Sequence, residues 1–262
     1  MDETYILEPV NYPFMGLQRI SIVTKRLYPA VDELKKHFEV VEDGEVCIAI
    51  GGDGTFLEAT RTHDSPILLI RGGEADSLGF HADTTLKELP AVIERLKAGA
   101  YTIEKQAKLR ITFGDKVFEA ANEAALLRAT PSAIHCRVSY YDDYGRRSPL
   151  YPGDIRGDGV IISRQIGSTA YNFHTRGPVL FGVDVAVVTP VSANYRFSIV
   201  CDRCFHLELR KSIGWLEYDG VEAARLKKGD TCTVTRSDKM VRIVRLDALE
   251  FFAEKLGRLL AF

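Results

Sequence analysis

The sequence predicts two parts: an N-terminal α/β domain with a doubly wound parallel sheet, then an all-β domain. Short apolar runs alternate with helical patterns over residues 18–98, and period-two alternation of apolar and polar residues begins at residue 100. Helical spacing returns over 247–262. With 262 residues the chain is long enough for two modest domains. We expect an α/β domain over 1–99, a β domain over 100–246, and a C-terminal helix (247–262) that packs back on the first domain.

The α/β expectation depends on apolar runs that are nearly continuous, as in parallel strands buried on both faces. The expected strands are 19–24, 45–50 and 66–70. The expected helices are 29–38, 55–62 and 84–99, the last interrupted by Pro90 and ended by Gly99. Thr55 and Glu58 have the spacing of a capping box, which predicts that the second helix begins at Thr55.

The β expectation depends on short segments in which every second residue is apolar, as in half-buried antiparallel strands. They include "CRVSYYD", "DGVIIS", "VDVAVVTPV", "FHLELR", "GWLEYDG" and "DTCTVTRS".

Composition and charge limit the classes of binding partner that we expect. The chain is 46% hydrophobic and 27% charged, with a formal charge of −2, so we expect neither nucleic acid nor a membrane surface as a partner. No apolar run approaches the roughly 20 residues of a membrane span. The acidic, proline-broken N-terminus does not fit a signal peptide. Five scattered cysteines, an odd number, predict reduced thiols and a cytoplasmic location.

The stretch "IAIGGDGTFLEAT" (48–60) is a strand, a glycine loop and a helix. A helix start offers unpaired N–H groups and partial positive charge, and glycines let a phosphate approach the backbone. Asp53 would repel that phosphate unless a cation intervenes or the carboxylate acts on a neighbouring hydroxyl, which suits phosphoryl transfer. The loop is neither a P-loop nor a GxGxxG fingerprint. The alternative is a tight Asp-Gly turn without a ligand.

"GGDGTFL" resembles the motif shared by NAD kinases, diacylglycerol and sphingosine kinases and, more distantly, phosphofructokinases. Four other stretches resemble NAD kinases: "SLGFHAD" (77–83), "AANEAAL" (120–126), "RGDGVIISRQIGSTAYNF" (156–173) and "EYDG" (217–220). The resemblance covers nearly the whole chain. It implies a β-sandwich for the second domain, a site between the domains, a homodimer or homotetramer, and phosphorylation of NAD to NADP with ATP or polyphosphate as donor and Mg²⁺ as the cation.

The resemblance also implies roles for residues. Asp53 would accept the proton of the adenosine 2′-hydroxyl. Asn122 would bind adenine, whose edge needs a donor and an acceptor, Glu123 would lie near the transferring phosphate, and Asp158 would bind the nicotinamide side. The expected NAD-binding residues are Gly54, Phe56, Asn122, Glu123, Asp158, Thr169, Ala170, Tyr171 and His174. The expected phosphate-binding residues are Gly51, Gly52, Gly54 and Thr55.

Purely structural interpretations of these residues stay open beside the functional ones. Asn122 and Glu123 would also suit a strand end, Asp158 a plain turn and Tyr171 a core position. Cys201 and Cys204 are more often structural than zinc ligands. The chain departs from the family pattern at Arg71, Arg164, Ile166, His174 and Arg176. These arginines would either add phosphate contacts or mark a changed donor or acceptor.

Three other functions remain as alternatives. A lipid kinase would share the glycine motif but not the Asn-Glu and Gly-Ser-Thr-Ala-Tyr stretches. A phosphofructokinase would need sugar-phosphate sites that we do not find in the sequence. A non-catalytic NADP(H)-binding homologue would fit the altered "SRQIG" stretch, although retention of Asp53 argues against it.

Overall fold

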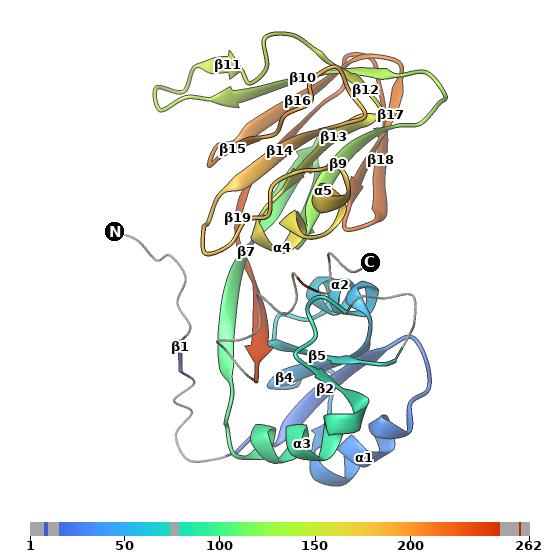
Figure 1. Ribbon diagram of the computed structural model, residues 1–262, viewed down its shortest axis with the longest axis vertical. Helices are drawn as coiled ribbons and strands as arrows, with labels where there is room; N and C mark the ends of the chain where they lie inside the picture. The colour runs from blue at the N-terminus through green and yellow to red at the C-terminus, as the bar shows by residue number, and fades with distance from the viewer. Residues whose placement is uncertain (1–7, 10–15, 74–78, 247–256, 258–262) are drawn as a thin grey trace. The chain divides into compact units, whose positions relative to one another are not determined.

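The computed structural model describes residues 8–9, 16–73, 79–246 and 257 and divides the chain into two compact units (Figure 1). Of the described residues, the α/β unit contains 8–9, 16–73, 79–105, 241–246 and 257, and the β unit contains 106–240. The divisions fall at 105/106 and 240/241 rather than at the expected 99/100 and 246/247. The reason is that β7 (Thr102–Phe113) and β19 (Thr231–Arg245) are long strands that each belong to both units.

The α/β unit is built on a parallel sheet. Its strands lie in the order β5-β4-β2-β3, and the end of β19 pairs in parallel with β5 at Ile243 and Ile67. Every residue of β4 is buried, as expected for a strand covered on both faces. The strands are β2 (Arg19–Thr24), β3 (Glu39–Val40), β4 (Val46–Gly51), β5 (Ile67–Arg71) and β6 (Thr84–Thr85); the two-residue β1 (Glu8–Pro9) pairs with β7.

Helices cover both faces of this sheet, which makes it doubly wound (Figure 1). The apolar sides of α1 (Pro29–His37) and α3 (Leu89–Lys97) share one core cluster with Ile48 and Ile50 of β4. In Figure 1, α2 (Asp53–Thr62) lies on the opposite face of the sheet. Successive side chains of a strand point to opposite faces of the sheet, so the same strands can pack against helices on both faces.

The β unit consists of antiparallel strands in two sheets. One sheet has the order β15-β14-β13-β9-β17-β18, and the other includes β11-β10-β16-β19, with β12 beside β10 and β8 beside β7. The first sheet contains β9 (Glu123–Arg128), β13 (Gly159–Ser163), β14 (Ala186–Val191), β15 (Ile199–Cys201), β17 (Ile213–Tyr218) and β18 (Val221–Lys227). The second contains β8 (Lys116–Ala120), β10 (Ile134–Tyr141), β11 (Arg147–Pro149), β12 (Ile155–Gly157) and β16 (Phe205–Lys211).

The two sheets share one apolar core. Val138 and Leu207 from one sheet and Leu126 and Val160 from the other are all almost completely buried in the same cluster. Buried residues alternate with more exposed ones along β10 and β16, whereas β13 is buried throughout, and the core lies between the two sheets as in a β-sandwich. The structure therefore has the predicted architecture, an α/β part and a β-sandwich part.

Three local predictions are corrected or fall outside the description. Helix α2 begins at Asp53 with Gly52 as N-cap, so the capping box at Thr55 was wrong; a capping box forms instead at Thr85 and Glu88, in the turn η1 (Leu86–Glu88). Pro90 lies in the first turn of α3, where its missing N–H costs nothing, so the expected helix over 84–99 starts later. The C-terminal helix expected over 247–262 lies outside the described residues, apart from Gly257.

Within the described part of the chain, no helix combines the length and the apolar composition needed to cross a membrane.

Candidate active site

The glycine loop joins β4 to α2 in the α/β unit. Gly51 has a φ of +152°, and a Cβ built there would lie 2.4 Å from Thr55 Oγ1, so a side chain at this position would collide with the helix. The carbonyl of Gly52 accepts the N–H groups of Thr55 at 2.9 Å and Phe56 at 3.2 Å. The loop thus passes into a ten-residue helix whose first N–H groups point back along the axis.

Asp53 is the first residue of α2, and its carboxylate holds a second segment in place. Oδ2 accepts the N–H of Phe80 at 3.0 Å and Oδ1 accepts the N–H of His81 at 3.1 Å. Phe56, one turn along the helix, is fully buried and stacks on the His81 ring at 4.7 Å. The structure therefore places Phe56, an expected NAD-binding residue, inside the unit, and gives Asp53 a structural task alongside any chemical one.

A cation that sequence reasoning missed also lies at the start of α2. Lys25 follows β2, and its Nζ lies 3.4 Å from Glu58 Oε2 and 3.9 Å from the position of a Cβ on Gly54. A cation beside the start of a helix favours an anion there. The signal in the sequence was only its position, directly after the first parallel strand.

The Asn-Glu pair lies in the β unit where β9 begins. Strand β9 runs between β13 and β17, and Glu123 is paired with Ser163 of β13. Asn122 and Glu123 are 6% and 8% exposed. In the described part of the chain, Asn122 Oδ1 and Glu123 Oε2 are buried and have no hydrogen-bond partner. Because buried polar atoms are nearly always satisfied, a ligand or a water molecule is expected to supply the missing partners of this adjacent pair.

Burial changes the acidity of Glu123. Loss of solvation raises its pKa to about 8, and the negative charges of Asp219 and Glu217 add to the effect. At neutral pH the carboxyl therefore keeps its proton and can donate a hydrogen bond. The neighbouring Tyr171 phenol also has a raised pKa, first because of burial and then because of Glu217, Asp158 and Glu123. The shared influence of these groups shows that they lie in one region.

Asp158 is held by an ion pair that the sequence did not predict. Arg128 Nε lies 2.8 Å from Asp158 Oδ1, and both side chains are about two-fifths exposed. An exposed pair of this kind is weak, typically about 0–1 kcal/mol, so a ligand group could displace the guanidinium. The charge of Asp158 acts on the Tyr171 phenol, so the structure brings these two residues near each other.

The Gly-Ser-Thr-Ala-Tyr stretch forms two short helical turns, α4 (Gln165–Ser168) and α5 (Tyr171–His174). A Cβ on Gly167 would lie 1.9 Å from the carbonyl oxygen of Asn122, so only glycine lets this turn approach the Asn-Glu pair. Thr169 is buried, and its Oγ1 donates to the Ile166 carbonyl at 3.2 Å. Ala170 is half-buried at the N-cap of α5, while Tyr171 and His174 are exposed.

The altered family positions mostly have structural tasks. Arg164 is only 3% exposed and donates to Asp184 Oδ1 at 2.5 Å, so it is part of a buried ion pair rather than a phosphate ligand. Ile166 is buried. Arg176 has a positive φ of 65° after α5 and lines a groove of about 460 Å³ with Tyr195. Arg71 packs against Gly79, 3.2 Å from the position of its Cβ.

Two polar residues organise this region although sequence reasoning gave them no role. Asn172 is fully buried; its amide donates to the carbonyls of Ser168 and Pro178, and Thr189 donates to its oxygen at 2.7 Å. Asp219 accepts the N–H groups of Ala121 and Asn122 at 2.8 and 2.7 Å. The sequence signals for Asp219 were the Asp-Gly dipeptide of a hairpin turn and the family resemblance of the "EYDG" stretch (217–220), which assigned the residue no role.

No dedicated metal cage is present: among the described residues, no three or more His, Cys, Asp or Glu side chains are grouped to hold an ion. All five cysteines are free thiols, including Cys201 and Cys204. Mg²⁺ is commonly held by substrate phosphates with one or two carboxylates rather than by an all-protein cage. Asp53 is a single carboxylate at a helix start, which is the kind of ligand set that this mode uses.

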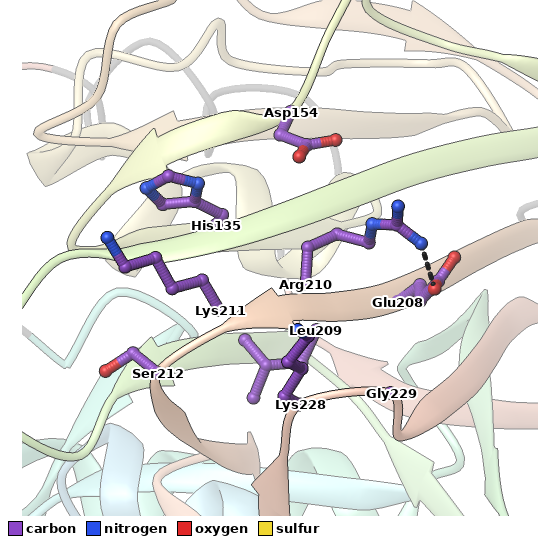
Figure 2. A pocket seen from close by; sticks show the side chains of 9 residues that line it. All are labelled: His135, Asp154, Glu208, Leu209, Arg210, Lys211, Ser212, Lys228 and Gly229. Carbon is purple, nitrogen blue, oxygen red and sulfur yellow. Dashed lines mark hydrogen bonds and ion pairs between the residues drawn. The ribbon is translucent and has the colours of Figure 1, made fainter.

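A separate groove of about 560 Å³ contains none of the expected site residues (Figure 2). Its carboxylates are ion-paired with arginines, Glu208 with Arg210 at 2.6 Å and Asp154 with Arg137 at 2.6 Å. Both carboxylates of this groove are therefore paired, and none of its lining residues has a buried side-chain atom without a hydrogen-bond partner in the described part of the chain. The lining residues are His135, Asp154, Glu208, Leu209, Arg210, Lys211, Ser212, Lys228 and Gly229.

Comparison with known proteins places this geometry in a family. Residues 121–246 match the model of the ATP-NAD kinase C-terminal domain. The chain is 31% identical over 221 residues to the NAD kinase of Clostridium kluyveri, covering 79% of this chain and 75% of that protein. Yeast NADH kinase, solved with NADH, superposes with a TM-score of 0.81 at 18% identity over 97% of this chain and 93% of that one. The NAD kinase of Archaeoglobus fulgidus, solved with ATP, gives a TM-score of 0.75 at 20% identity over 94% and 100%. The chain belongs to the NAD kinase family of enzymes.

Proposed function

We propose that this chain transfers the terminal phosphoryl group of ATP to the 2′-hydroxyl of the adenosine of NAD, yielding NADP and ADP. The observation that carries the proposal is the buried, unpartnered Asn122 Oδ1 beside Glu123 in a chain that also has a glycine loop at a helix start. The name of the Clostridium kluyveri relative supports this reaction, and the ATP and NADH in the two solved structures support the substrate pair.

Asn122 suits an adenine edge. Adenine presents a donor at N6 and an acceptor at N7, and an Asn side chain can satisfy both. Oδ1 of Asn122 would accept from the adenine amine, which would give this buried oxygen a partner. The protonated carboxyl of Glu123 would donate to an oxygen of the same nucleotide.

In the proposed step, the 2′-oxygen attacks the γ-phosphorus, the bond from that phosphorus to the bridging β,γ-oxygen breaks, and ADP leaves. The proton of the 2′-hydroxyl passes to Asp53. A carboxylate is too weak a base to remove it beforehand, so it moves as transfer proceeds. The N–H groups at the start of α2 and the charge of Lys25 would hold the donor phosphates. Mg²⁺ on those phosphates would supply charge neutralisation, and Asp53 would be a carboxylate available to hold it.

Several finer points belong to the same proposal. Polyphosphate is the alternative donor, because a helix start and a lysine recognise phosphate rather than a base. We also propose a homodimer or homotetramer, as the family resemblance implies, and a cytoplasmic location, supported by five free thiols.

The test is to incubate the chain with ATP, Mg²⁺ and NAD and to measure NADP with an NADP-specific dehydrogenase. Parallel reactions replace ATP with polyphosphate, replace NAD with NADH, or include a chelator in place of Mg²⁺. We expect NADP with ATP and Mg²⁺, and none with the chelator. Tight NADP binding without NADP formation would instead favour a non-catalytic binding homologue, and phosphorylation of diacylglycerol would favour a lipid kinase.

A further inference from the structure

We propose that Asp219 is a positioning residue of the nucleotide site, which holds the Asn122–Glu123 backbone so that both side chains face the ligand. The inference rests on the proposed function, because Asn122 and Glu123 are its nucleotide-binding residues. Nothing in the reaction requires Asp219 to touch the substrate, since it acts through the residues that it holds.

One carboxylate receives three consecutive backbone N–H groups. Asp219 Oδ2 accepts from Ala121 at 2.8 Å, and Oδ1 accepts from Asn122 at 2.7 Å and Glu123 at 3.3 Å. The N–H of Asp219 in turn donates to the carbonyl of Glu123 at 3.2 Å. Asp219 is only 6% exposed, so these bonds to an ionised group are shielded from water. The Asp219 side chain therefore holds three successive residues, 121–123, where β9 begins.

The turn that carries Asp219 does not explain its charge. Asp219 and Gly220 form the two-residue loop between β17 and β18, with φ values of +47° and +73°. Such a loop needs residues that tolerate positive φ, and Asn fulfils that requirement as well as Asp. An Asn would offer one oxygen and an NH₂ group to three N–H donors. A carboxylate, with acceptor sites on both oxygens, fits all three.

The negative charge of Asp219 also contributes to the raised pKa of Glu123. Burial is the main reason that the pKa of Glu123 is raised to about 8, Asp219 is the next and Glu217 the third. Tyr171 faces the same region, Asp158 is paired with Arg128 beside it, and Glu222 acts on Glu217. Removal of the negative charge of Asp219 therefore removes one cause of the raised pKa of Glu123 and should lower that pKa.

The experiment compares Asp219→Asn with Asp230→Asn in the full-length chain. Asp230 is a matched control because its carboxylate also accepts a backbone N–H in a hairpin turn, that of Lys227 at 2.8 Å, but it does not contact residues 121–123. Three quantities are measured: the melting temperature, the NAD affinity by calorimetry, and the titration midpoint of Glu123. The midpoint comes from carbon-13 NMR of labelled glutamate carboxyl groups, with Glu123→Gln to assign the signal.

We expect Asp219→Asn to weaken NAD binding roughly tenfold or more, since loss of charged hydrogen bonds displaces Asn122 and Glu123. The Glu123 midpoint moves to lower pH, and any pH limb of NADP formation that follows Glu123 moves with it. Asp230→Asn changes neither quantity. If Asp219→Asn lowers only the melting temperature and leaves NAD affinity and the midpoint at parental values, Asp219 is merely structural and the inference is overturned.

The readouts separate this inference from the proposed function. A parent chain that forms no NADP contradicts the proposed function, yet the Glu123 midpoint still shows whether Asp219 acts on Glu123. A parent that forms NADP, with NAD affinity unchanged by Asp219→Asn, contradicts the positioning role alone.

Discussion

Asn122 carries an unusual state for a residue of the interior. Its backbone N–H is bonded to Asp219, while its side-chain oxygen is buried without a partner in the described part of the chain. A buried polar atom without a partner lowers stability by about 1–3 kcal/mol. The folded chain retains this atom at the position where the family resemblance places adenine.

This state predicts that Asn122→Ala separates stability from binding. The substitution removes an unsatisfied oxygen, so the free energy of unfolding should stay within about 1 kcal/mol of the parent. NAD affinity should fall by about 1–3 kcal/mol, because the adenine edge loses its partner. Calorimetry with NAD and with ATP checks it. The same NAD affinity in variant and parent would show that Asn122 does not bind the adenine of NAD. A loss of ATP affinity as large as the loss of NAD affinity would show that the contact is not specific to NAD.

The sequence predicts which residues are candidates for the site, but it does not predict the contacts that surround them. Motif resemblance named Asp53, Asn122 and Glu123 because their spacing in the chain is visible. The contacts of Asp219 with residues 121–123 join positions 96 to 98 residues apart, which no local pattern encodes. Likewise, an arginine looks like a phosphate ligand in the sequence, and only the pairing of Arg164 with Asp184 shows its structural use.

At the scale of the element, the start of α2 depends on two glycines with different tasks. Gly51 avoids a collision with Thr55, whereas Gly54 has open space, with Lys25 Nζ the nearest atom at 3.9 Å from a built Cβ. Local packing therefore requires glycine at 51 but not at 54. The absence of a side chain at 54 is explained if the donor phosphates approach there.

We predict that Gly54→Ala has opposite effects on folding and binding. Alanine in a helix is favoured over glycine by roughly 0.5–1 kcal/mol, so the unfolding midpoint should rise. A methyl group in the path of the phosphates should weaken ATP binding roughly tenfold, about 1.4 kcal/mol. Denaturant unfolding and ATP calorimetry measure the two effects. A variant with a raised midpoint and parental ATP affinity would mean that the phosphates do not approach Gly54.

Element boundaries show where sequence patterns are weakest. The Thr55–Glu58 spacing indicated a cap, but Gly52 caps the helix because the positive φ of Gly51 turns the chain before Asp53. Three strands of the parallel sheet, β2, β4 and β5, were predicted within about a residue, because buried apolar runs are bounded by polar residues on both sides; the two-residue strands β3 and β6 were not predicted. The expected boundaries at 99/100 and 246/247 lay outside the long strands β7 and β19, whereas the units divide within both strands, since period-two alternation does not show where one unit ends.

At the scale of the whole molecule, the proposed function assigns each unit a different recognition task. The α/β unit presents a helix start, Asp53 and Lys25, which suit phosphates. The β unit presents Asn122 and Glu123, whose backbone is held by the Asp219 carboxylate. Their side chains suit the edge of a nucleotide base. Period and composition predicted the two architectures, since helical and alternating patterns bury different faces. The sequence did not show that Asp53 is bonded to Phe80 and His81, and this contact bears on the test of its role.

The most direct test of the account is single-turnover NADP formation by Asp53→Asn at saturating ATP and NAD. Asn keeps the size of Asp but provides one acceptor oxygen for the N–H groups of Phe80 and His81, so some stability is lost and the assay must run below the variant's melting temperature. Binding of both substrates should persist, while the transfer rate falls by about 10²–10⁴, the usual contribution of a positioned base. A rate within about threefold of the parent, only about 0.65 kcal/mol of barrier, would contradict the role of Asp53 as proton acceptor.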